Sequence, residues 1–426
     1  MSQISPPASS KVLPAHGSEP AAARALRVAG AVCLVLMPLA MWLANRSAPL
    51  MLGLAAAAFL GAGLLSGPAT AVLARLRALL SAPLALAVVA FLAWALVSIG
   101  WSHNPSMSLR AWGELVLPIV FALAIAASGQ LQRSPVLLRA LALAIIVASG
   151  LLVFELASGL SQRSALGSGK MMSFVFNRPA VVLLLLAAPT VHALWSRPAA
   201  GLPDRALAAL LAVIVVVFVF RSESEAAKLG ALVLIACWAL ARVAPRIALA
   251  GTALAFVLTM AVAPVLGPMA EKLVPSFVLN RLDVMSAQAR IDIWDSFGEV
   301  ARARPIAGAG FGTSATMHLH PVAPEVSAEH RTLLEVGHPH DMPLQAWAET
   351  GAVGAGLLTL AGLLLLAWLR RLPAAEQAPR LALFAAAFSI ATVGHGAWQG
   401  WWIAGLGAAT LLFCRDAASR QGDSHV

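Results

Sequence analysis

Two histidines stand directly before a predicted helix and could exchange protons with a substrate. His338 and His340 flank Pro339 and are followed by Asp341 and Pro343. Imidazole titrates near neutral pH, so either side chain could serve as a general base. Asp341 is suited to cap a helix and Pro343 to occupy its first turn. The positive end of that helix would favour an anion beside the histidines. An isolated histidine here would more commonly be a satisfied polar residue at a membrane interface.

The composition is typical of a membrane protein that crosses the bilayer many times. Hydrophobic residues make up 60% of the 426 residues, charged residues make up 11%, and the mean hydropathy is +0.84. Apolar runs of about 20 residues, long enough to cross a bilayer, recur along the chain. We therefore predict an all-α fold with about twelve transmembrane helices. They lie near 28–44, 48–65, 83–100, 112–128, 136–158, 176–194, 205–220, 226–241, 246–266, 343–369, 379–394 and 398–415.

These spans divide the chain into five predicted parts. Residues 1–23 are rich in Ser, Pro and Ala and are expected to form a disordered cytoplasmic tail. Residues 24–266 would hold the first nine spans, and 343–415 the last three. Between them, 267–342 would form one large periplasmic loop that contains amphipathic helices and elements of the site. Residues 416–426 would be a second cytoplasmic tail.

Arginines set the predicted orientation. Most basic residues fall on one side of the spans, and the positive-inside rule makes that side cytoplasmic. They are Arg24, Arg27, Arg75, Arg77, Arg133, Arg139, Arg197, Arg205, Arg242, Arg246, Arg370, Arg371, Arg380, Arg415 and Arg420. The net charge of +10 largely reflects this bias. Because no motif of interleaved basic and aromatic residues is present, we expect no nucleic acid as a partner.

A second group of cations lies on the opposite, translocated side. They are Arg163, Lys170, Arg178, Arg221, Lys228, Arg281, Arg290, Arg302 and Arg304. Each could be an ordinary exposed loop cation or could pair with a nearby acid such as Glu223, Glu225, Asp283 or Asp292. As a group converging from three loops, they favour an anionic ligand. A diphosphate suits them because the guanidinium fork matches phosphate oxygens.

The segment 281–303 has the periodicity of an amphipathic helix. Apolar residues recur at spacings of three and four and alternate with charged ones. We expect this helix to lie at the membrane interface with its aromatic side in lipid. Arg290, Trp294 and Phe297 share one face. Arg290 would therefore either contact a ligand or extend to lipid headgroups.

The loop that follows contains glycines and histidines. Gly308, Gly310 and Gly312 permit a tight backbone, which on its own indicates a turn. His318, His320 and His330 lack a cysteine or carboxylate arrangement that would complete a metal site, so we expect them at the surface.

Several of these motifs, in this order, resemble the O-antigen ligases and the related O-antigen polymerases. The pattern His340-Asp341, nine residues and then Gly351-Ala-Val-Gly354 is similar to the family's signature. The family usually has Asn, Ser or Gln where this chain has Asp341. Upstream, Arg290-x-x-x-Trp294, Arg304-Pro305 and Gly308-x-Gly310-Phe-Gly312 resemble the block that precedes the family's histidine.

Two further matches lie earlier in the chain. Phe176-Asn-Arg-Pro-Ala180 begins a predicted span, and Lys228-Leu-Gly-Ala-Leu232 stands where the family often has Arg followed by Leu. Lys keeps the charge but not the bidentate geometry. The firm resemblance covers roughly 281–357.

The resemblance implies a membrane glycosyltransferase at the periplasmic face of the bacterial inner membrane. Such an enzyme takes glycan from undecaprenyl diphosphate and transfers it to the lipid A core, with no nucleotide, metal or other cofactor. Arg290, Arg178 and Lys228 would bind the diphosphate, and His340, or second His338, would be the base. One displacement would invert the anomeric centre. Glu335 and Glu349 are the nearest carboxylates for a double displacement, which we consider less favoured.

Two alternatives remain at this level. One is an O-antigen polymerase or a protein-glycosylating ligase, which shares the chemistry. The other is a transporter of polyprenyl-linked glycan without chemistry. A transporter would tend to bury charges at mid-membrane. Here the spans are nearly free of charge apart from Glu114 and Glu155 near their ends, so an enzyme is favoured.

Overall fold

The computed structural model describes residues 19–167, 171–197, 199–273 and 284–414. All regular elements in these ranges are helices. Ten segments are long and apolar enough to cross a membrane by length and composition, which establishes a multi-pass membrane protein. The predicted tail 416–426 and residues 1–18 of the predicted tail 1–23 lie outside the described residues, and residues 21–23 of that tail are helical.

The helices of these ten segments are α1 (Ala21–Leu43), α2 (Ala48–Ser66), α4 (Pro83–Ser98), α5 (Pro105–Ser128), α6 (Pro135–Ala157), α8 (Asn177–Ser196), α9 (Leu202–Arg221), α10 (Glu225–Val243), α11 (Pro245–Val262) and α15 (Met342–Leu369). Shorter helices are α3 (Ala69–Leu80), α7 (Ser161–Ala165), α12 (Leu266–Leu273), α14 (Val284–Ala303), α16 (Ala374–Ala391) and α17 (Gly400–Leu411). Short 3-10 helices are η1 (Ile99–Trp101), η2 (Ser173–Phe176), η3 (Ala263–Val265), η4 (Thr313–Leu319), η5 (Ala323–Glu325) and η6 (Arg331–Val336).

The last two predicted spans correspond to α16 and α17. They have 18 and 12 residues and are not among the ten candidate segments. Ten of the twelve predicted spans are therefore confirmed by length and composition. The number beyond ten stays a prediction.

Local sequence signals explain where helices begin. Side-chain oxygens of Asn104, Ser134, Ser224 and Asp341 accept hydrogen bonds from the first turns of α5, α6, α10 and α15. Proline follows at N1 or N2 in α5, α6 and α15, where its missing N–H costs nothing. The capping role of Asp341 is thereby confirmed.

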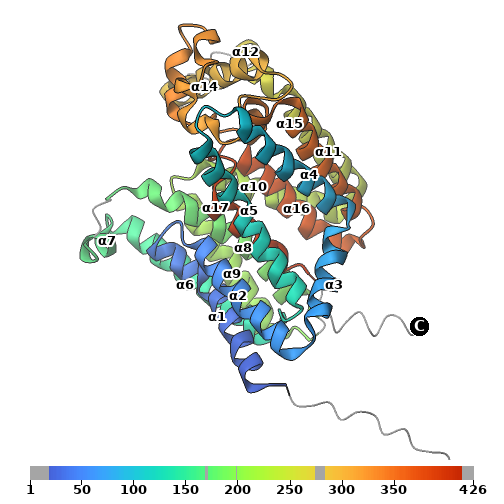
Figure 1. Cartoon of the computed structure of the whole chain (residues 1–426). Helices are drawn as coiled ribbons and strands as arrows, with labels where there is room; N and C mark the ends of the chain where they lie inside the picture. The colour runs from blue at the N-terminus through green and yellow to red at the C-terminus, as the bar shows by residue number, and fades with distance from the viewer. Residues whose placement is uncertain (1–18, 168–170, 198, 274–283, 415–426) are drawn as a thin grey trace, which may run out of the picture.

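The two ends of the bundle differ in chemistry. At one end, predicted cytoplasmic arginines tie neighbouring chain segments together: Arg75 donates to Ser128 O, and Arg380 to Phe413 O. Arg139 and Arg197 both pair with Asp204 there. At the other end lies the long connection between α11 and α15. Figure 1 shows α12 and α14 together beyond the ends of α11 and α15.

The helix α14 packs into protein, not into lipid. Phe297 is fully buried and shares a core cluster with Leu334 and Leu344. Arg302 donates to Pro264 O at 2.6 Å and ties the helix to η3. The helical prediction is confirmed for residues 284–303, but the expected lipid-facing side was wrong. The apolar stripe has a protein partner, because residues 313–336 fold over it.

Gly308 of the loop and Gly351 of α15 form a close backbone contact. Gly308 has φ +70°, and a Cβ there would lie 2.3 Å from the backbone carbon of Glu349. Gly351 has φ +62° and interrupts α15, and its Cβ would lie 2.2 Å from Ile306 O. The interruption frees carbonyls that Ala309 N and Gly310 N satisfy. The glycine motif at 308–312 and the glycine motif at 351–354 therefore lie on the two sides of one backbone contact.

Candidate active site

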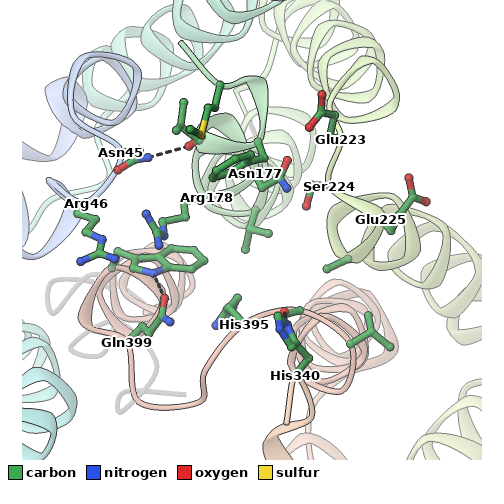
Figure 2. Close-up of a pocket in the computed structure, with 18 of the residues that line it drawn as sticks. Asn45, Arg46, Asn177, Arg178, Glu223, Ser224, Glu225, His340, His395 and Gln399 are labelled. Atoms are coloured by element: carbon green, nitrogen blue, oxygen red, sulfur yellow. Dashed lines mark hydrogen bonds between the residues drawn. The ribbon is translucent and has the colours of Figure 1, made fainter. Parts of the chain in front are cut away.

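A cavity of about 880 Å³ opens at the end of the bundle that carries the long connection. Its walls come from the α1–α2 turn, the α7–α8 region, the start of α10, Arg290 of α14, the His338–His340 segment and the α16–α17 connection. Figure 2 shows Arg46, Arg178, His340 and His395 directed into this space. Segments more than 350 residues apart in the chain thus meet at one place.

His340 is held in one orientation. Its Nδ1 lies 2.8 Å from Gly394 O. A carbonyl oxygen can only accept, so Nδ1 carries the proton and Nε2 keeps a free lone pair. The residue has φ +54°, an uncommon conformation for a residue other than glycine. Burial lowers its pKa, the hydrogen bond to Gly394 opposes this, and Arg290 adds to the lowering. The imidazole is therefore neutral at pH 7 and able to take a proton.

His338 lies against His340, with 4.1 Å between ring centroids. Its Nδ1 accepts from His340 N. Burial, followed by the charges of His340 and His395, lowers the pKa of His338 to about 3. Such a low pKa makes His338 a weak proton acceptor. Of the two predicted histidines, His340 is thus the better placed base.

Four arginines line the cavity: Arg46, Arg163, Arg178 and Arg290. Among the described residues, none of the four forms an ion pair. Arg290 donates to Val393 O at 3.0 Å, and Arg178 lies over the ring of Trp401 at 5.9 Å. Arg163 lies over the ring of Phe176 at 4.6 Å. Cations gathered without anionic partners fit a ligand with several negative charges.

Carboxylates also reach the cavity. Glu223 accepts a short hydrogen bond from Ser173 Oγ, and Glu225 pairs with Lys228 at 2.8 Å. Lys228 itself is not among the lining residues. The structure thus brings Arg290, Arg178, His338 and His340 together and leaves Lys228 one ion pair away.

The remaining predicted cations have other surroundings. Arg304 pairs with Glu325 at 2.6 Å, and Arg302 is occupied by Pro264 O. Lys170, Arg281 and Asp283 lie outside the described residues.

Sequence reasoning missed Arg46 and His395. Arg46 is a lone cation in the short α1–α2 turn, on the same side as the other misplaced cations. That shared side was the signal that could have found it. His395 sits between Gly394 and Gly396, and its ring packs against Trp401 and Trp402 at 4.5 and 4.7 Å. A histidine in a glycine turn between two apolar segments was a weaker signal.

The two carboxylates considered for a double displacement do not line the cavity. Glu349 is fully buried and accepts from Gly312 N, Trp398 Nε1 and Gln345 Nε2 at 2.6, 2.7 and 2.9 Å. Glu335 is exposed.

The loop histidines were all expected at the surface, but His320 is buried. His320 is 7% exposed and packs edge-on against His103, so its predicted surface position was wrong. The reason is that His320 Nδ1 accepts from Val322 N and turns the ring inward. Among the described residues, no group of three or more His, Cys, Asp or Glu side chains could hold a metal ion.

Fold and cavity together define a multi-pass helical membrane protein with a cationic, histidine-bearing site at one end. A family model described as O-antigen ligase matches residues 208–359. This part of the chain is therefore similar to the O-antigen ligase family. The matched region includes Lys228, Arg290, His338 and His340. Comparison with curated proteins and with solved structures found no match.

Proposed function

We propose that the protein is an O-antigen ligase. It transfers glycan from undecaprenyl diphosphate to the lipid A core at the periplasmic face of the inner membrane. The observation that carries this proposal is the cavity in which Arg290 and Arg178, neither ion-paired within the described residues, face the neutral imidazole of His340. A diphosphate leaving group needs cations, and an acceptor hydroxyl needs a proton acceptor.

The proposed reaction is one displacement. The acceptor hydroxyl oxygen attacks the anomeric carbon while the bond from that carbon to the diphosphate oxygen breaks. Nε2 of His340 takes the hydroxyl proton, and the electron pair leaves with the diphosphate. Arg290, Arg178 and Arg46 stabilise the charge that grows on the leaving group. Attack from the face opposite the leaving group inverts the anomeric centre. The arginines supply the electrostatic stabilisation, so we expect the reaction to need no metal.

Lys228 has an indirect role in this scheme. Its ammonium pairs with Glu225, which lines the cavity. Pairing reduces the negative charge of Glu225 toward the diphosphate. Lys228 can also contact the diphosphate when the pair opens, because the side chain of Glu225 is 73% exposed.

The test is reconstitution from purified components. Protein, polyprenyl-diphosphate glycan and lipid A core are incubated with EDTA and without nucleotide. Glycosylated lipid A core with inverted anomeric configuration is the expected product. Elongated donor glycan would instead identify a polymerase, and intact donor after prolonged incubation would support the transporter. Loss of activity with EDTA would contradict the metal-independent mechanism.

A further inference from the structure

A second cavity of about 510 Å³ adjoins the first. His338 and Gln399 line both cavities. None of the four arginines of the first cavity lines the second. Its walls come from the start of α5, the segments around Gly312 and Gly337, the start of α15 and the α16–α17 connection. The two cavities therefore meet at His338 and Gln399.

The lining of this cavity has the chemistry of a saccharide site. Arg110 and Glu114, one turn apart on α5, pair at 3.4 Å with side chains 80% and 49% exposed. Asn104 uses its side-chain oxygen to cap α5, which leaves its amide nitrogen free to donate. Trp398 adds an aromatic wall. Sugars offer hydroxyls that both donate and accept, together with apolar C–H faces, and these groups match that lining.

The wall beside His338 is held rigid by buried hydrogen bonds. Glu349 accepts from Gly312 N and Trp398 Nε1 at 2.6 and 2.7 Å. Gln345 donates to Glu349 and accepts from Ala397 N at 2.9 Å. This network joins the loop, α15 and the α16–α17 connection. A fixed wall positions a bound ligand with little loss of entropy on binding.

The direction of attack decides which ligand fits. In a single displacement the nucleophile arrives opposite to the leaving group. The arginines fix the diphosphate in the first cavity, so the acceptor hydroxyl must come from the other side. We propose that the second cavity binds the acceptor saccharide, with Arg110 and Glu114 holding its hydroxyls and His338 at the passage between the two sites. This rests on the proposed function and adds the acceptor's binding residues to it.

Two variants test the assignment. Arg110→Ala removes a donor from an exposed pair, which contributes little to stability, so folding should survive. Ala315→Trp places a large side chain into the cavity from an exposed position. Arg24→Ala is the control, because Arg24 is also exposed and paired with an acid, Glu19, at the opposite end of the bundle.

The assay uses full-length protein, lipid A core and the same core oligosaccharide freed from its lipid. Loss of one charge-assisted hydrogen bond should raise the KM for lipid A core about tenfold. The Kd for polyprenyl-diphosphate glycan should stay unchanged, and freed oligosaccharide should inhibit the wild type more strongly than either variant. Arg24→Ala should match the wild type.

Each contrary outcome is distinct. An unchanged acceptor KM in both variants, with the wild type active, overturns the acceptor site and leaves the proposed function standing. A raised donor Kd with an unchanged acceptor KM would assign the cavity to the donor. A wild type that transfers nothing to lipid A core would overturn the proposed function itself.

Discussion

The hydrogen bond from His340 Nδ1 to Gly394 O fixes which nitrogen can act as a base. His340→Ala removes that base while the arginines still hold the donor. We expect transfer to fall on the order of 100- to 10,000-fold with donor affinity kept. Single-turnover transfer and a separate donor-binding measurement check this. His338→Ala should do less damage. Full turnover in His340→Ala would mean that another group takes the proton.

The pH dependence follows from the surroundings of His340. Burial lowers its pKa below the ordinary value near 6.5. The neutral, active form is therefore present at pH 7, and the rate should decline only when the pH falls below about 6.5. A pH–rate profile of kcat between pH 4 and 8 tests this prediction. An acid limb above the ordinary histidine pKa would contradict it.

Arg290 donates one hydrogen bond to Val393 O, and its other N–H groups are available to bind a ligand. Arg290→Ala should lower transfer on the order of 100- to 1000-fold, because the variant lacks a cation that stabilises the diphosphate leaving group. Arg290→Lys should also be impaired if the fork geometry matters. Lys228→Arg should be tolerated, since it keeps the charge beside Glu225. Wild-type turnover of the purified, membrane-inserted Arg290→Ala protein would remove Arg290 from the site.

At the scale of elements, Asp341 ties α15 to the site and is 3% exposed. Burial raises its pKa to about 7, opposed by the hydrogen bond from Leu344 N. The folded protein therefore holds a proton that the unfolded chain, with a carboxyl pKa near 4, releases. The free energy of unfolding should fall as the pH rises from about 4 to about 7, and it should fall no further from this group above about pH 7.

Asp341→Asn caps α15 about equally well and does not titrate. We expect it to be more stable than the wild type at pH 8, on the order of a few kcal/mol, and similar at pH 4. Thermal unfolding in detergent at both pH values measures this. A stability difference between variant and wild type that does not change with pH would show that desolvation of the ionised Asp341 carboxylate does not destabilise the fold.

Local sequence patterns were sufficient to predict the long apolar helices, α14 and the start of α15 at Asp341. These features depend on local spacing and capping. The partner of the Phe297 face and the inward ring of His320 depend on distant segments, and both were predicted wrongly. Arg46 and His395 join the cavity only because α1–α2 and α16–α17 approach α8 in space. Their local sequence signals do not show that these segments meet in space.

At the scale of the whole molecule, the two ends of the bundle predict the orientation in the membrane. Arginines that bind carbonyls and Asp204 gather at one end, and the cavity opens at the other. We expect both termini in the cytoplasm and 267–342 in the periplasm. Reporter fusions after residues 270 and 425 should report opposite sides. If both fusions report the same side, the predicted number of spans is wrong and the site cannot be placed in the periplasm by this argument.

The shortness of α17 has a consequence for how a lipid reaches the site. Its inner end is held near the arginine-rich surface by Arg133 and Arg380, which donate to Leu412 O and Phe413 O. With 12 residues it rises about 18 Å, against a hydrocarbon core of about 30 Å. If its inner end lies at the cytoplasmic boundary as predicted, its outer end and the turn that carries His395 should lie about 12 Å short of the outer boundary. We expect the floor of the cavity to be recessed into the outer leaflet, so that the proposed lipid-anchored diphosphate enters sideways without being lifted from the bilayer.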